Sequence, residues 1–271
     1  MNITIIYFSP TGNTAKISLA INKELQKLGN KVDMLDITNS EDRQKISDFN
    51  YNDALFFGFP IYYGRAPRLI REWFSQFDGK GIKCSLFFTY GGVQVGAAHY
   101  DMINILQSRN FKVISSAEFL GRHTYSLAGW DLMKDHPNKQ DIVVAREFAQ
   151  KTHEKLIESN IKQLKFAVPK KSEEELDKLE FMSKRAIITP ARKLNDCSMC
   201  RTCEQVCPTN AMDAELGKPK PNLCIRCLRC VVNCPDNVIK IEDMSYQFKR
   251  IKKLRHLTDD KLKSRQSRYF L

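Results

Sequence analysis

Long hydrophobic runs are missing from this sequence. No stretch approaches the 18 consecutive apolar residues of a membrane-spanning helix, and residues 1–8 lack the basic start and the cleavage site of a secretory signal. Hydrophobic residues nevertheless make up 42% of the 271 residues, which suffices for a buried core. We therefore expect a globular protein without a membrane span or an export signal.

Cysteine is scarce everywhere except in one short stretch. Of the nine cysteines, only Cys84 lies outside positions 197–234, and it stands inside an apolar run. An isolated cysteine of this kind is most simply a small buried residue. Cysteines gathered in one stretch fit a reducing compartment in which thiols are kept for metal binding and not for disulfides. We therefore expect a cytoplasmic protein.

The gathered cysteines form two runs of identical spacing. Each run reads Cys-x2-Cys-x2-Cys-x3-Cys-Pro, and the second follows the first by 27 residues. Asn210 and Glu215 recur at the same interval as Asn237 and Glu242, which indicates an internal duplication of a βαβ-like half. A zinc ribbon is the alternative, but it pairs two Cys-x2-Cys knuckles and stops at four ligands.

This spacing resembles that of the bacterial ferredoxins with two [4Fe–4S] clusters, in which the fourth cysteine of each run binds the other run's cluster. The resemblance implies low-potential one-electron transfer. It assigns to one cluster the ligands Cys197, Cys200, Cys203 and Cys234. It assigns to the other cluster the ligands Cys207, Cys224, Cys227 and Cys230.

The first 160 residues alternate strand-like apolar runs with amphipathic segments. This alternation predicts an α/β fold with a doubly wound, five-stranded parallel sheet, which binds ligands at the carboxyl ends of its strands. We expect strands at 3–8, 31–37, 53–59, 82–90 and 111–120. We expect helices around the stripe of Ile17, Ile21 and Leu25 and at 67–76, 96–107 and 139–159.

Lysine is absent from the loop after the first expected strand, Ser9-Pro-Thr-Gly-Asn-Thr14. Hydroxyl groups, a glycine and free amides at a helix N-terminus suit a phosphate group. The missing Gly-Lys-Ser/Thr excludes a Walker P-loop. A plain Ser/Thr helix cap is the alternative interpretation.

Two further loops, at 58–67 and 89–96, follow the third and fourth expected strands. Their tyrosines and glycines suit the faces and the polar edge of a flavin ring. Together the three loops resemble those of the flavodoxins, which bind FMN non-covalently. The resemblance assigns the phosphate to Ser9, Thr11, Gly12, Asn13 and Thr14. It assigns the ring to Pro60, Ile61, Tyr62, Tyr63 and Gly64 on one side and to Thr89, Tyr90, Gly91 and Gly92 on the other.

A third loop, 121–130, follows the fifth expected strand and carries His123 and Trp130. It either covers the ligand or packs on the surface, and we favour packing. No paired carboxylate accompanies His123 or His99, so no catalytic acid or base is predicted. The Gly-x-Gly-x-x-Gly fingerprint of a dinucleotide site is also missing.

Two segments lie outside these motifs. Residues 161–193 form a connector, in which Ser172 and Glu175 predict a capping box at the start of a helix; the connector either docks the two halves together or is a plain spacer. Residues 244–271 form a tail with nine Lys or Arg against Asp259 and Asp260. Its apolar spacing predicts an amphipathic helix that packs on the body, binds an acidic redox partner or binds an anionic surface. Nucleic-acid binding is not expected, because no reader motif accompanies the charge.

As a whole the sequence resembles the flavodoxin–ferredoxin fusion proteins of anaerobic bacteria and archaea, with a flavodoxin-like domain at 1–160 and a ferredoxin domain at 194–243. The resemblance implies a cytoplasmic electron carrier that links FMN, two [4Fe–4S] clusters and redox partner proteins. One alternative is an FMN-dependent reductase of a quinone or a nicotinamide, with the clusters as an internal wire. The other is a ferredoxin whose flavodoxin-like part binds no flavin and serves for docking.

Overall fold

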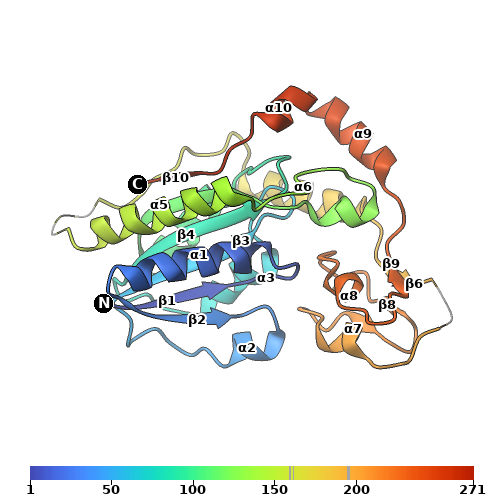
Figure 1. Ribbon diagram of the computed structural model, residues 1–271, viewed down its shortest axis with the longest axis horizontal. Coiled ribbons are helices and arrows are strands. Elements are labelled where there is room, and N and C mark those ends of the chain that lie inside the picture. The colour runs from blue at the N-terminus through green and yellow to red at the C-terminus, as the bar shows by residue number, and fades with distance from the viewer. Residues whose placement is uncertain (159, 161, 194–195) are drawn as a thin grey trace.

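The structure is a computed structural model that describes residues 1–271 except 159, 161, 194 and 195. A larger part holds a β-sheet between layers of helices, and a smaller part of short helices and strands lies beside one end of the sheet (Figure 1). The helix end expected at 159 and the domain limits expected at 161 and 194 fall on residues outside this description. No helix among the described residues is long and apolar enough to cross a membrane.

Five parallel strands form the body of the sheet, in the order β5-β4-β3-β1-β2. They are β1 (Asn2–Tyr7), β2 (Lys31–Asp36), β3 (Ala54–Pro60), β4 (Lys83–Tyr90) and β5 (Lys112–Leu120). Each end agrees with the predicted strands to within one residue. Helices cover both faces, so β3 and β4 are buried along almost their whole length. The sequence of β3 is apolar throughout, and that of β4 is apolar apart from Lys83, Ser85 and Thr89.

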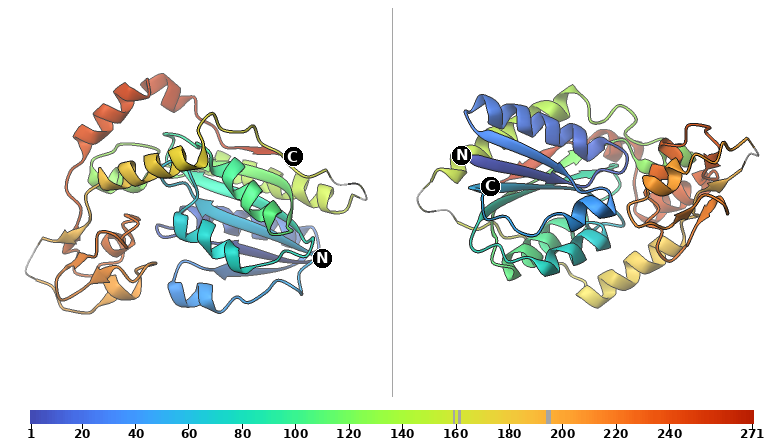
Figure 2. Two further views of the ribbon diagram at one scale, coloured as in Figure 1. Left: turned by 180° about the vertical axis from the view of Figure 1, so that it is seen from behind. Right: turned by 90° about the horizontal axis from the view of Figure 1, so that it is seen from below.

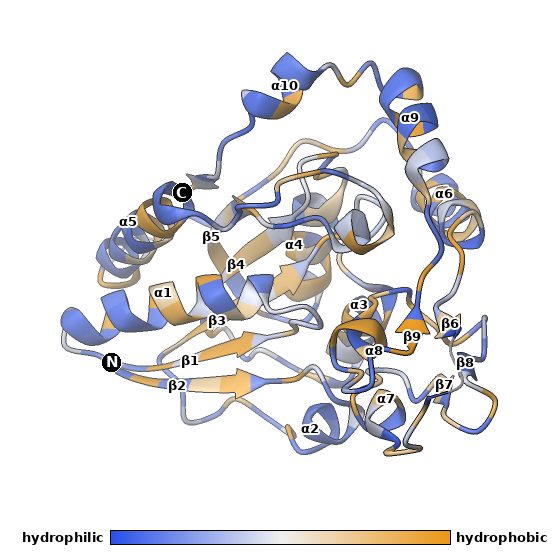
Figure 3. Cartoon of the chain, turned by 45° about the vertical axis from the view of Figure 1, so that its right-hand side comes forward, coloured by the Kyte–Doolittle hydropathy of each residue, from blue (hydrophilic) through white to orange (hydrophobic). Residues whose placement is uncertain are grey.

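Successive side chains of the strands enter two separate cores. Phe56 packs on one face with α1 (Asn13–Lys27) and α5 (Lys139–Leu156), and Phe57 packs on the other. The second core contains α3 (Arg68–Trp73), η1 (Phe74–Gln76) and α4 (Ala98–Ser108). Figure 2 shows the helices on both sides of the sheet, and Figure 3 shows hydrophobic strands beneath helices of mixed hydropathy. The predicted helices are confirmed, whereas α2 (Ser40–Gln44) is too short to give a periodic signal.

The smaller part contains one unit twice. The unit β6 (Ala191–Arg192), α7 (Thr202–Gln205) and β7 (Met212–Asp213) recurs 27 residues later as β8 (Lys218–Pro219), α8 (Arg229–Val232) and β9 (Ile239–Lys240). The strands pair across the repeat, because β6 pairs with β9 and β7 with β8, both antiparallel. The predicted duplication is confirmed, and the two copies interlock.

The backbone repeats as closely as the elements do. Met199 and Arg226 have φ angles of 56° and 58°, and Asn210 and Asn237 have 50° and 54°. Arg201 and Leu228, each the residue after a cysteine, both have 58°. A left-handed backbone conformation is energetically costly for residues other than glycine. Its recurrence at equivalent positions therefore indicates that both loops need the same tight turns.

The C-terminal residues return to the larger part. After α9 (Ser245–Leu254) and α10 (Asp259–Lys263), β10 (Arg268–Phe270) pairs antiparallel with β5 as a sixth strand (Figure 1). The sequence did not predict β10, because three residues carry no periodic pattern. Of the three interpretations of the tail, packing on the body is confirmed by β10 and by Phe248 and Ile251, which pack with Trp130.

Ser267 fixes β10 to the sheet. Its buried hydroxyl accepts a hydrogen bond from the N–H of Leu120 at 2.9 Å and donates one to Asp141 at 2.6 Å. Arg268 donates to Glu118 at 2.6 Å, and Glu118 also contacts Nε2 of His99 at 3.0 Å. A network of hydrogen bonds therefore holds β10 against the edge of the sheet, and each buried polar group in it has a partner.

Replacing Ser267 by Ala should lower the free energy of unfolding by about 1–3 kcal/mol, because a buried N–H loses its acceptor and a buried carboxylate loses a donor. Urea unfolding followed by circular dichroism measures the change. Ser264→Ala is the matched control, since that hydroxyl is exposed and bonds only the carbonyl of Lys261. Equal losses for the two variants would contradict the anchoring role of Ser267.

Candidate functional site

A cavity of about 630 Å³ opens at the carboxyl ends of β1, β3, β4 and β5. Its volume is typical of a site for a small ligand or cofactor. Of the fourteen residues expected to hold a flavin, Gly12 and Gly92 are outside its lining. The other twelve line it: Ser9, Thr11, Asn13, Thr14, Pro60, Ile61, Tyr62, Tyr63, Gly64, Thr89, Tyr90 and Gly91.

The loop before α1 leaves amides free for an anion. Gly12 has φ 88° and begins α1 without a side-chain cap, while Ser9 Oγ accepts from the N–H of Ala15 at 3.0 Å. The amides of Asn13 and Thr14 find no acceptor among the residues that the structure describes. Ser9 thus satisfies one amide of the first turn, as a capping hydroxyl would. Asn13 and Thr14, whose amides stay without an acceptor among the described residues, line the cavity at the N-terminus of a 15-residue helix.

Most polar side chains of this loop are already bonded within the protein. Thr14 Oγ1 lies 2.8 Å from Thr89 Oγ1, and Asn13 Nδ2 donates to the carbonyl of Arg122 at 2.8 Å. Thr11 lines the cavity and makes no such hydrogen bond among the described residues. The loop is thus held by β4 and by the loop after β5, and Thr11 keeps a hydroxyl for a ligand.

The loop after β5 covers the cavity. His123, Tyr125 and Trp130 line it, and Trp130 is 3% exposed. A Cβ at position 91 would stand 2.2 Å from the ring of His123, so only glycine fits there. The sequence favoured surface packing for this loop, but the loop does both, since Trp130 also stacks on Phe248 at 5.2 Å.

Burial fixes the protonation of the aromatic groups around the cavity. It lowers the pKa of His123 to about 4, and Nδ1 accepts from the N–H of Tyr125 at 3.1 Å. The neutral ring therefore carries its proton on Nε2. Burial also raises the pKa of Tyr63 to about 12. The Tyr63 hydroxyl has no hydrogen-bond partner of normal geometry among the described residues, although that of Tyr125 is close.

Three segments that sequence reasoning missed form the roof of the cavity. They are the connector helix α6 (Glu173–Arg185), the tail helix α9 and the loop that contains Arg226. The sequence predicted an amphipathic helix in the connector and another in the tail, but it did not indicate which surface their apolar faces cover. Among the residues that the structure describes, no Asp, Glu or Lys lines the cavity, whereas four arginines do: Arg122, Arg226, Arg250 and Arg255.

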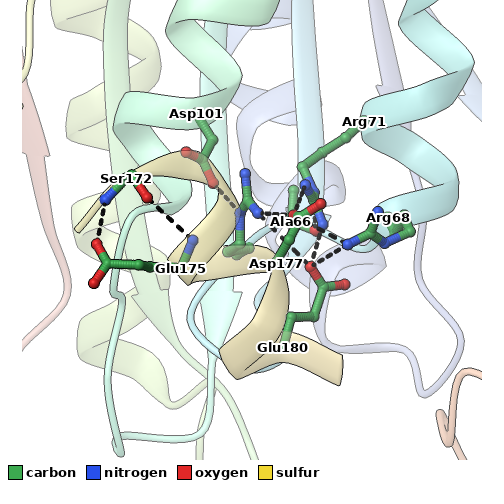
Figure 4. Close-up of polar contacts among 9 residues, drawn as sticks. Ala66, Arg68, Arg71, Asp101, Ser172, Glu175, Asp177 and Glu180 are labelled. Atoms are coloured by element: carbon green, nitrogen blue, oxygen red, sulfur yellow. Dashed lines mark hydrogen bonds and ion pairs between the residues drawn. The ribbon is translucent and has the colours of Figure 1, made fainter. Parts of the chain in front are cut away.

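Helix α6 is held over the cavity by ion pairs (Figure 4). Its predicted capping box is present, with Ser172 and Glu175 bonded at 2.8 and 3.2 Å. Arg65, whose side chain is 3% exposed, pairs with Asp101 and with Asp177 of α6, the latter at 2.5 Å. Arg71 pairs with Glu180 one turn further along. A buried guanidinium without its carboxylate would be strongly destabilising, so the connector docks at a fixed place and is no plain spacer.

The cysteines of the two runs meet across the repeat. Cys207 of the first run lines a small cavity together with Cys224, Cys227 and Cys230 of the second. All are free thiols, and Cys84 is a buried thiol inside β4, as predicted. Backbone N–H groups donate to three sulfurs: Ala211 to Cys207 at 3.2 Å, Arg226 to Cys224 at 3.4 Å and Val238 to Cys234 at 3.4 Å.

The arrangement suits a cluster better than a single ion. No three His, Cys, Asp or Glu side chains in the described part of the chain converge on a point that would hold one metal ion. A cubane core lies between its thiolates and keeps them apart, and hydrogen bonds to the sulfurs are typical of such sites. Burial raises the pKa of Cys227 to about 12, so iron must displace the proton of this thiol when it binds.

The two cavities are linked through Arg226. Arg226 lines the larger cavity, and its sequence neighbour Ile225 lines the smaller one together with Cys224 and Cys227. The hydroxyl of Tyr125 donates to the carbonyl of Arg226 at 3.4 Å, and the N–H of Arg226 donates to Cys224. A chain of hydrogen bonds therefore leads from one site to the other.

Replacing Thr11 by Ala should weaken FMN binding about tenfold or more, because a hydrogen bond to a charged group contributes about 1.5–3 kcal/mol. Titration of the apoprotein with FMN, followed by flavin fluorescence, measures the effect. Iron content should stay the same. Unchanged affinity would contradict a phosphate site in this loop.

Combining Asp177→Asn with Glu180→Gln should loosen α6, because Arg65, Arg68 and Arg71 lose the carboxylates that face them. We expect faster tryptic cleavage within α6 and faster dissociation of FMN. Glu174→Gln is the matched control, because this exposed residue of the same helix belongs to none of the ion pairs. Equal behaviour of both variants would refute the role of the ion pairs.

Comparison with known proteins locates two families in the chain. A family model described as a flavodoxin domain matches residues 4–94, and one described as a 4Fe–4S binding domain matches residues 193–213. An uncharacterized protein of Methanocaldococcus jannaschii is 30% identical over 141 residues, which are 51% of this chain and 88% of that protein.

Solved structures of flavodoxins are also similar. A flavodoxin from the domain Archaea is 14% identical with a TM-score of 0.42, over 58% of this chain and 99% of its own. The oxidised flavodoxin 2 of Bacillus cereus is 17% identical with a TM-score of 0.46, over 57% of this chain and 99% of its own.

Proposed function

This chain belongs to the flavodoxin–ferredoxin fusion proteins, and from this membership we propose that it carries electrons between one FMN and two [4Fe–4S] clusters. The observation that carries the proposal is the link at Arg226, which lines the larger cavity and whose N–H donates to Cys224 of the smaller one. FMN exchanges one or two electrons and each cluster exchanges one, so the pair converts between paired and single electrons. The protein supplies the two sites and the short path between them.

We propose that two sets of cysteines hold the clusters. The inner set is Cys207, Cys224, Cys227 and Cys230, and the outer set is Cys197, Cys200, Cys203 and Cys234. The inner set lies against the sheet domain, where Arg43 donates to the carbonyl of Pro208 at 2.5 Å and Arg229 to Asn39 at 2.7 Å. Cys224 and Cys227 are buried whereas Cys200 is exposed, so redox partner proteins would meet the outer cluster.

The flavin loops take roles that follow from their contacts. The free amides of Asn13 and Thr14 and the hydroxyl of Thr11 would bind the phosphate, with the charge of Arg122 beside them. The ring would lie between the loop after β3 and the loop after β4, which carry Tyr62 and Tyr90. His123 would present its Nε2 proton to the cavity.

We propose domain limits that follow the contacts. The flavin domain would comprise residues 1–160 and gain β10 from the tail. The ferredoxin domain would begin at β6, a few residues before position 194, because β6 pairs with β9. A reducing compartment such as the cytoplasm suits a chain with nine free cysteines.

Reduction of a small anionic substrate at the flavin is a second candidate. It is favoured by Arg250 of α9 and by Arg255, the residue that follows α9. Both arginines line the cavity, whereas no carboxylate among the described residues does. A nicotinamide dinucleotide has the matching charge. Steady turnover of NADH by the purified protein, with a quinone as acceptor, would favour this reductase over the electron carrier.

The decisive experiment is a flavin and iron assay on one anaerobically purified sample. About one FMN and about eight irons per chain would support the carrier with two clusters. About eight irons without flavin, even after reconstitution, would leave the sheet domain a docking module. About four irons would refute the second cluster.

Cys203→Ala should reduce the iron content from about eight to about four per chain and destabilise the smaller domain, because cluster ligation contributes to its folding. Cys84→Ala is the matched control and should retain all the iron, since Cys84 is buried alone in β4. Elemental analysis and low-temperature EPR provide the readout. Full iron retention in Cys203→Ala would refute the ligand assignment.

A further inference from the structure

The two halves of the ferredoxin domain differ in charge at equivalent positions. Because the repeat is 27 residues, each residue beside one cysteine set has a counterpart beside the other. Arg226 corresponds to Met199, and both have the same left-handed backbone. Thr209, two residues after Cys207, corresponds to Asp236, two residues after Cys234. At these two positions the inner set has the cation Arg226 where the outer set has uncharged Met199, and the outer set has the anion Asp236 where the inner set has uncharged Thr209.

Arg226 is a buried cation that has no carboxylate partner in the described part of the chain. The residue is 7% exposed, and its guanidinium donates only to main-chain carbonyls: Ile187 at 2.8 Å, Cys224 at 2.9 Å and Pro221 at 3.4 Å. Carbonyl dipoles satisfy its hydrogen bonds but leave its net charge in place. That charge lies beside Cys224 of the inner set, whose carbonyl it binds, and Arg226 also lines the flavin cavity.

Arg43 brings a second such charge from the sheet domain. It is 9% exposed and also donates only to carbonyls, those of Ile37 and Thr38 at 2.9 Å and that of Pro208. Pro208 follows Cys207 and lines the inner cavity. Two buried guanidinium groups thus flank the inner set from opposite domains.

The outer set has a cation too, but this cation is neutralised. Arg201 pairs with Glu215 at 2.5 Å and lies 3.9 Å from Glu204, and its side chain is 54% exposed. Asp236 accepts from the N–H and the hydroxyl of Ser198, each at 2.7 Å, next to Cys197. The fixed charges beside the outer set therefore favour the oxidised, less negative state of the outer cluster.

We infer that Arg226, supported by Arg43, gives the inner cluster a higher reduction potential than the outer cluster, so that an electron delivered at the exposed outer cluster moves to the inner cluster, which lies on the flavin side. The inference rests on the proposed function and adds the direction of electron flow between the clusters. An added electron makes a cluster more negative, so a nearby cation stabilises the reduced form, most strongly where water is excluded.

Burial of the inner set acts in the opposite direction, because desolvation disfavours the more highly charged state. Two features limit this opposition. Cys207 and Cys230 are only half-buried, and the sulfurs of Cys207 and Cys224 each accept a backbone N–H, which stabilises added negative charge. Buried cations also act unscreened, whereas the exposed charges around the outer set are screened by water and salt.

The test is a redox titration of the holoprotein, followed by EPR, with variants that exchange the equivalent residues. Arg226→Met copies the outer loop and should lower one cluster midpoint. At a fixed solution potential the ratio of reduced to oxidised inner cluster should then fall about tenfold, which for one electron equals about 59 mV. Met199→Arg should raise the other midpoint, and Arg226→Lys should stay close to wild type.

Thr209→Asp provides an independent variant, because it places an anion beside the inner set without disturbing the bonds of Arg226. It should lower the same midpoint that Arg226→Met lowers. If both variants keep their iron and flavin and move neither midpoint, the inferred role of Arg226 is wrong while the electron-transfer function stands. A wild-type protein without flavin or without two clusters would overturn both.

Discussion

The burial of a parallel sheet on both faces determines where this protein can do chemistry. Helices cover β3 and β4 on both faces, so a polar side chain within them, such as Ser85, is buried and bonded inside the protein, and binding groups lie at the strand ends and in the loops that follow. Parallel strands bring their carboxyl ends to one edge. The loops after β1, β3, β4 and β5 therefore share one cavity although they are far apart in the sequence.

The ferredoxin domain obeys a different constraint. Its strands are two residues long and its helices four, so hydrophobic burial alone gives it little stability. Interlocked repeats and convergent cysteines take the place of a core, and tight left-handed turns aim the thiols inward. The same cysteines therefore form the site and contribute to the stability of this domain. The domain gains further support where Arg43 and Arg226 bind carbonyl groups.

Local patterns were enough to predict the sheet and the two motifs. Ile3, Phe56 and Leu86 stand in apolar runs, and the cysteine spacing is a fixed ligand geometry that needs no tertiary knowledge. The roof of the cavity could not be predicted in this way. Arg65 is an ordinary charged residue in sequence, and only the fold brings it to Asp177, a partner more than a hundred residues away. The same holds for β10, whose partner strand lies far upstream. Spacing predicts which residues form a face but not what the face will contact.

The return of the tail to the sheet has a consequence for how the protein is made. A chain leaves the ribosome from its N-terminus, and its domains fold as they emerge. The five parallel strands and the three flavin loops are therefore complete while α9 and β10 are still unmade. During that interval the cavity is covered by the loop after β5 and by α6 alone, because the loop with Arg226 and helix α9 are added with and after the ferredoxin domain. The order of the segments along the chain thus lets a ligand reach the three loops before the roof of the cavity is complete.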